Sequence, residues 1–264
     1  MISHHFFLNV YNKPYNLYYL EQVRYKQSKE SSILCDLNNY FVTKPKINTL
    51  VEHNSPEEKE SISQRILQRI GVSVNEYSVL NVHKIGIEVP VKYVFEELLQ
   101  WDGHSNFWPN RLAKVKRING SLEKILIYTL GVDKLNFGGL LGKGIKFKPL
   151  FNMSALKFQY TTPSSDTDNA RYLLYKCSGG YPIGIFALYV RSSISEQHET
   201  EKTQLFSLVA FNFYGKKTWF YNNIINPIWE KIHNRATANI LNRMKLEFEN
   251  AFTGSFSETS NKLH

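Results

Sequence analysis

The chain has 264 residues, of which 42% are hydrophobic and 14% aromatic, so it can bury a sizeable core and wholesale disorder is excluded. Two cysteines argue against a disulfide scaffold or a cysteine-rich zinc module, and no apolar run reaches the roughly 20 residues of a membrane span. The formal net charge is +9, but the basic residues are scattered, so no nucleic-acid partner is expected. Met1–Leu8 lacks a basic leader, which favours a cytoplasmic protein.

The first part of the chain predicts an extension followed by one helix. Residues 1–54 are rich in Asn and Tyr and show no sustained strand or helix period, so we expect an N-terminal extension that packs on the main domain. Ser55, Pro56 and Glu58 then form a typical helix start, with a capping serine and a proline in the first turn. The sequence predicts a linking helix over residues 55–71.

The main domain is expected over residues 72–252, followed by a flexible tail over 253–264. A strand that ends at Pro90 leads directly into a short helix, and Asn119-Gly120 favours a two-residue hairpin. Apolar residues at helical spacing from about Trp219 to Phe252 predict a long C-terminal helix with Pro227 in its first turn. The predicted strands are 77–89, 112–118, 122–130, 155–162, 171–178, 183–194 and 203–214, and the short helix is 91–101.

This order of elements predicts an α+β fold in which a curved antiparallel sheet wraps around the long C-terminal helix. The stretch Val82–Trp101, followed by Phe107-Trp108-Pro109-Asn110, is similar to the opening of the START-like, or SRPBCC, superfamily. The usual pattern is a strand ending at Pro, a helix beginning Val-Phe and a loop with Trp-Pro. The resemblance implies a helix-grip fold with an apolar cavity between sheet and helix. Residues 1–75 fall outside the pattern and could cover the cavity mouth or a sheet edge.

Candidate site residues follow from side-chain parity along the strands. Asn81 and His83 share a face with Ile85, so they should point into the cavity, where His83 could orient a ligand or act as a general base. The alternative is a histidine whose ring is satisfied by its neighbours. Tyr175 lies on one later strand, and Tyr189 and Arg191 share a face of the next; Arg191 could bind a ligand carboxylate or lie exposed at a strand end. The full set is Asn81, His83, Ile85, Trp101, Trp108, Tyr175, Tyr189, Arg191, Trp229 and His233.

The resemblance implies binding or transport of a hydrophobic small molecule, such as a lipid or polyketide, in that cavity. A second hypothesis is a cyclase- or dehydratase-type enzyme that uses His83 in the same cavity. A third is peripheral binding to an anionic membrane surface through residues 137–148, a basic flap with Leu140-Leu141 at its tip. The eight histidines lack zincin spacing, and no carboxylate pair points clearly inward, so neither a metal nor another cofactor is expected.

Overall fold

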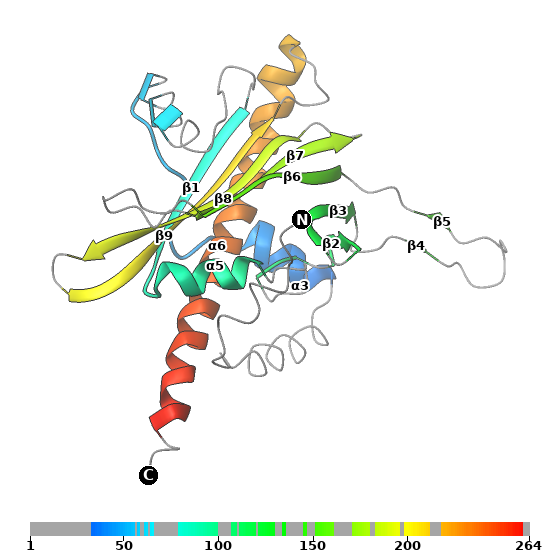
Figure 1. Ribbon diagram of the computed structural model, residues 1–264. Helices are drawn as coiled ribbons and strands as arrows, with labels where there is room; N and C mark the ends of the chain where they lie inside the picture. The colour runs from blue at the N-terminus through cyan, green and yellow to red at the C-terminus, as the bar shows by residue number, and fades with distance from the viewer. Residues whose placement is uncertain are drawn as a thin grey trace.

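The computed structural model describes two main parts of the chain, an N-terminal segment and a sheet with its helices. The described residues are 33–55, 57–58, 61–62, 64–65, 79–99, 107–109, 111–119, 121–129, 134–135, 145–146, 151–160, 171–179, 183–195, 198–211 and 218–260. Seven strands form one antiparallel sheet in the order β1-β9-β8-β7-β6-β3-β2, and the 35-residue helix α6 crosses it (Figure 1). The predicted helix-grip fold is therefore confirmed.

The strands lie close to their predicted positions. Asn119 adopts a positive φ of 55° between β2 and β3, as the predicted hairpin requires. The segment after Ser195 was expected to be a loop, but β9 already begins at His198. The polar first residues of β9, from His198 to Lys202, pair through their backbone with the end of β8, and this pairing needs no apolar side chains. The strands are β1 Val79–Ile87, β2 Ala113–Ile118, β3 Ser121–Thr129, β6 Phe151–Tyr160, β7 Arg171–Gly179, β8 Ile183–Ser195 and β9 His198–Phe211.

Helix α6 extends further towards the C-terminus than its sequence signal indicated. Helix α6 runs over Asn226–Ser260, so the segment 253–260 of the expected tail is helical. A π-helical turn, η3 (Tyr221–Ile225), precedes it, and α5 (Val91–Leu99) follows β1 as predicted. Two short elements, α3 (Ile33–Leu37) and η1 (Asn38–Val42), lie in the extension. A separate two-stranded ribbon pairs β4 (Lys134–Leu135) with β5 (Ile145–Lys146).

The main sheet carries apolar side chains on both faces. On the inner face Ile85, Leu188 and Leu205 pack in one cluster with α5 and with Leu241 and Met244 of α6. On the outer face a second cluster contains Leu80, Val82, Tyr172, Leu174, Tyr189, Phe206 and Leu208. Because both faces are apolar, alternation along one strand does not reveal which face meets α6.

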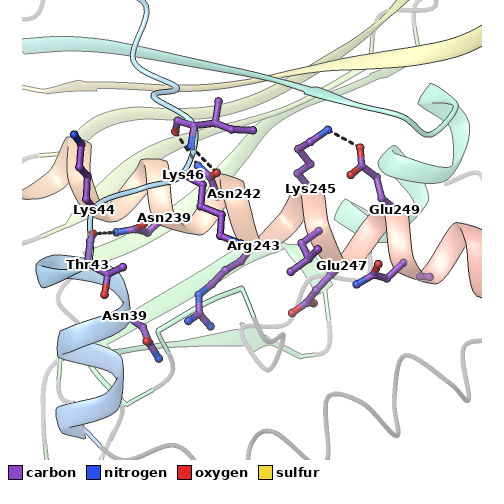
Figure 2. Close-up of a pocket in the computed structure, with 14 residues that line it drawn as sticks. Asn39, Thr43, Lys44, Lys46, Asn239, Asn242, Arg243, Lys245, Glu247 and Glu249 are labelled. Carbon is purple, nitrogen blue, oxygen red and sulfur yellow. Dashed lines mark hydrogen bonds and ion pairs between the residues drawn. The ribbon is translucent and has the colours of Figure 1, made fainter.

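The segment 38–51, here called the strap, binds both α6 and the free edge of β1. Asn239 donates to the carbonyls of Tyr40 and Thr43 at 3.0 and 2.8 Å. Asn242 accepts from the Ile47 amide at 3.0 Å and donates to its carbonyl at 2.9 Å (Figure 2). Backbone bonds then join the strap to β1, from Lys84 to Thr49 at 2.7 Å and from Val51 to Val82 at 2.9 Å. The extension thus covers the edge of the sheet.

Candidate functional site

A pocket of about 330 Å³ lies between the inner face of the sheet, the loop around Trp108 and α6. Its walls are mainly apolar and aromatic. The sheet contributes Phe186, Leu188 and Val209, and α6 contributes Ile240, Leu241 and Met244. Phe41 of the strap also lines it, so the strap reaches the cavity as well as the sheet edge. Such a space is at the lower end of the volumes that small-molecule sites occupy, about 300–1,000 Å³.

Three polar residues, Ser207, His233 and Thr237, face this pocket. Ser207 is buried on β9, and His233 and Thr237 lie one helical turn apart on α6, with Nδ1 and Oγ1 3.4 Å apart. Burial, together with the nearby His83, lowers the pKa of His233 to about 4. The imidazole is therefore neutral at pH 7 and presents hydrogen-bonding nitrogens rather than a charge. The pocket combines an apolar body with a few neutral polar groups.

Trp108, Trp229 and His233 are the predicted site residues that line the pocket. Trp108 Nε1 donates to the Ala113 carbonyl, which fixes the corner formed by Trp108-Pro109. The rings of Trp229 and His233 are 6.4 Å apart between centroids on successive turns of α6. Trp101 lies outside the described residues.

His83 lies on the inner face, as expected, but its ring is enclosed by neighbours. Nδ1 is 2.9 Å from Thr49 Oγ1, and Nε2 is 3.2 Å from Asn234 Oδ1. The side chain is 1% exposed, and burial lowers the pKa of His83 to about 4, although the bond with Asn234 acts in the other direction. The geometry matches the histidine satisfied by its neighbours, because both ring nitrogens are engaged and the residue does not line the pocket.

Asn81, Ile85 and Tyr175 also lie on the inner face but outside the pocket wall. Asn81 is buried; in the amide orientation that satisfies both of its polar atoms it donates to Glu230 Oε1 at 2.5 Å. Ile85 is a core residue. Tyr175 stacks on Phe186 at 6.2 Å, and its buried hydroxyl has no hydrogen-bond partner in the described part of the chain. Burial raises the pKa of that hydroxyl well above its ordinary value.

Tyr189 and Arg191 lie on the opposite face of the sheet from the pocket, whereas the sequence pattern placed them among the candidate ligand contacts. Tyr189 pairs with Phe206 across the β8–β9 ladder and belongs to the outer cluster. Arg191 donates from Nε and from one terminal nitrogen to Gln204 Oε1, at 2.9 and 2.7 Å, and its guanidinium lies 5.3 Å from the Phe206 ring centroid. The expected parity within β8 was right, but the choice of inner face was not, because β8 is apolar on both sides.

Four residues in and around the site were not found from the sequence: Thr49, Ser207, Asn234 and Thr237. Ser207 lies directly opposite His83 in the β1–β9 ladder, a relation that depends on register. A weak signal did exist in α6, where Asn234, Asn239 and Asn242 stand within a long helix although Asn is a poor helix former. Each of these amides has a partner on another element.

A second pocket, of about 600 Å³, lies between the strap and the other side of α6 (Figure 2). Lys44 and Lys46 of the strap line it together with Arg243 and Lys245 of the helix. Lys245 is paired with Glu249 at 2.5 Å, and Arg243 lies over the Tyr40 ring at 4.8 Å. Asn239, Asn242 and Arg243 therefore contact the strap, whereas Lys245 and Glu249 pair within α6 and bind backbone groups of Gly86 and Glu88.

Residues 137–144, most of the proposed flap, lie outside the described residues, and for Ile145–Lys146 the structure gives the backbone alone. Within the described ranges no helix is both long and apolar enough to cross a membrane. The same ranges hold no group of three or more His, Cys, Asp or Glu side chains suited to a metal ion.

No protein-family model matches the chain, and no curated protein matches it. Among solved structures it is similar to the Zhui aromatase/cyclase from Streptomyces sp. R1128, with 17% identity, a TM-score of 0.39, and coverage of 65% of this chain and 93% of the other. A norcoclaurine synthase from Thalictrum flavum has 10% identity and a TM-score of 0.37, with 64% and 87% covered. A conserved protein from Geobacillus kaustophilus has 12% identity and a TM-score of 0.33, with 66% and 97% covered.

The strand order and the packing of α6 identify the fold. The main sheet begins with β1 beside the last strand β9, and α6 packs on its inner face through Leu241, Met244 and Phe248. The chain therefore has the helix-grip fold that its resemblance to the START-like superfamily implied.

Proposed function

We propose that this protein binds a hydrophobic small molecule in the pocket between the sheet and α6. The observation that carries the proposal is the composition of the pocket wall, in which aromatic and aliphatic side chains surround about 330 Å³ and three neutral polar residues stand among them. Apolar burial contributes roughly 25 cal/mol per Å² of ligand surface removed from water, so affinity would come from the apolar wall. Orientation would come from the polar groups.

The polar groups favour a ligand with a hydroxyl or carbonyl rather than a charge. Ser207 and Thr237 each carry a hydroxyl that can donate one hydrogen bond and accept others, and Nε2 of neutral His233 can either donate or accept one, depending on the tautomer. None of the described residues that line the pocket is an acid or a lysine or arginine, so among them a charged ligand group would find no ionic partner. Lipids and polyketides with few polar atoms meet this requirement.

Binding is favoured over catalysis by the state of the two histidines. His83 has both ring nitrogens engaged, by Thr49 and Asn234, and lies behind the pocket wall. His233 reaches the pocket, but with a pKa of about 4 it is a weak base at neutral pH, whereas an efficient general base has a pKa near the working pH. We therefore do not propose that the protein is a cyclase- or dehydratase-type enzyme that uses His83.

The test is binding of a neutral fluorescent apolar probe, Nile red, measured on two matched variants of α6. Ala236 lines the ligand pocket, and Ala251 lines the pocket under the strap. We expect Ala236→Phe to fill the cavity and weaken probe binding at least about tenfold, a loss of ~1.4 kcal/mol. Ala251→Phe should leave it unchanged. Equal probe binding by both variants, with native circular dichroism spectra, would refute the proposed site.

A further inference from the structure

Five large apolar side chains are exposed around the start of α6. Trp219 is 72% exposed, Phe220 51%, Ile224 39%, Ile228 58% and Ile232 44%. Four of them, Phe220, Ile224, Ile228 and Ile232, recur every four residues and therefore form one stripe along the helix. We call these five residues the exposed stripe. In Figure 1 the first turns of this helix, in light orange, extend beyond the strands, so the sheet does not cover them.

The exposed stripe ends at the ligand pocket. Ile232 is both 44% exposed and part of the pocket wall, and Trp229, one residue after Ile228, also lines the pocket. The opening of the cavity on this side therefore lies next to the stripe. A surface that covered the stripe would also face the route by which an apolar ligand enters or leaves.

The charges beside the stripe are positive. Lys231 and Arg235 are exposed on the same turns of α6. Glu230 is half-buried and accepts a hydrogen bond from Asn81, so it faces the sheet rather than the stripe. In the sequence Lys216 and Lys217 come directly before this region. An apolar helix face with flanking Lys and Arg and a Trp at its end is the pattern of a helix that lies in a membrane interface.

We propose that the exposed stripe docks on an anionic lipid bilayer and holds the opening of the ligand pocket against the membrane surface. Charge complementarity selects this occupant over a second copy of the chain, because a symmetric pair would bring the Lys231 and Arg235 side chains of both copies together. Docking on the bilayer does not require a ligand in the pocket. Exchange of ligand between pocket and bilayer, in contrast, rests on the proposed function.

The test is sedimentation of the full chain with vesicles of phosphatidylcholine alone or mixed with phosphatidylglycerol. We expect binding to the mixed vesicles that weakens as salt is added. The double variant Ile224→Ser with Ile228→Ser should bind at least about tenfold more weakly, because it removes two apolar side chains from the interface. Leu246→Ser is the matched control, since Leu246 is 57% exposed on α6 but lines the pocket under the strap. It should bind as the unchanged protein does.

Three results would overturn the docking proposal. The first is that the protein does not sediment with the mixed vesicles. The second is that the double variant binds them as strongly as the unchanged protein. The third is that a flap variant, Leu140→Ser with Leu141→Ser, loses binding while the double variant of the stripe keeps it. A fall in oligomer size on gel filtration for the double variant, without any vesicle binding, would identify a second copy as the occupant. Vesicle binding by the Ala236→Phe variant, whose ligand pocket is filled, separates failure of docking from failure of the proposed function.

Discussion

The ring of His83 on β1 and the side chain of Asn234 on α6 meet with Nε2 and Oδ1 3.2 Å apart. Thr49 of the strap occupies the other ring nitrogen at 2.9 Å. One imidazole thus joins the edge strand, the long helix and the N-terminal extension, beside Ser207 of the pocket wall, its partner in the β1–β9 ladder. The side chain that the sequence indicated as a candidate for ligand binding or catalysis therefore links three elements of the fold through its two ring nitrogens.

Replacing His83 with Ala should destabilise the protein by ~2–4 kcal/mol, because it opens a buried space and leaves Thr49 and Asn234 without their partner. The free energy of unfolding from urea titration measures the effect. His53→Ala is the control, since the Nδ1 atom of half-buried His53 has no partner in the described residues and its loss should cost little. Equal effects of the two changes would contradict the structural role of His83.

Stability should depend on pH in a defined window. His83 and His233 are neutral in the folded protein down to about pH 4, whereas in the unfolded chain they titrate near 6.5. Between these values the unfolded chain binds more protons, so the free energy of unfolding falls as the pH is lowered from about 6.5 to about 4 and is full above that window. Urea midpoints at a series of pH values measure this. His233→Phe should make the free energy of unfolding depend less steeply on pH in this window. An unchanged pH dependence would contradict the contribution of His233.

Asn239→Ala should release the strap from α6. The amide of Asn239 donates to two carbonyls, and the side chain is 6% exposed, so its loss should cost ~1–3 kcal/mol. Limited proteolysis should then cut more rapidly between residues 38 and 47. Asn250→Ala serves as control, because Asn250 lines the same pocket of the same helix without a hydrogen-bond partner in the described part of the chain. Equal cleavage of both variants would argue against this role.

Ser207→Ala should weaken a bound ligand more than it weakens the fold. The hydroxyl faces the pocket, and losing one neutral hydrogen bond costs ~0.5–1.5 kcal/mol, or about two- to twelve-fold in affinity. Isothermal titration with a ligand recovered from the protein gives the affinity, and urea denaturation gives the stability. A loss of stability with unchanged affinity would place this hydroxyl in the core rather than in recognition.

Local signals predicted most of the fold. Pro90 between β1 and α5, the Asn119 turn and the apolar periodicity of α6 all depend on neighbours in sequence, and each was found as expected. The assignment of residues to the inner or outer face could not be predicted from local signals, because it depends on which strands pair with each other. Arg191 was assigned to the wrong face for this reason, although its alternation with neighbours was read correctly.

The environment of the candidate site could not be predicted in the same way. His83 was placed on the right face, but its partners are 34 residues before it and 151 after it, and no local pattern relates them. Much of the strap is held through its backbone, by asparagines of α6 and by amide bonds to β1, and such contacts require no periodic pattern of apolar side chains. Only the unusual presence of Asn in a long helix pointed to such contacts.

The proposed function requires that the cavity between the sheet and α6 holds an apolar molecule. Native and then denaturing mass spectrometry of the unchanged protein and of Ala236→Phe, each incubated with a total lipid extract, tests it most directly. We expect a near-stoichiometric small molecule that leaves the unchanged protein on unfolding and is absent from the variant. Retention of no molecule by the unchanged protein, or equal retention by both, would contradict it.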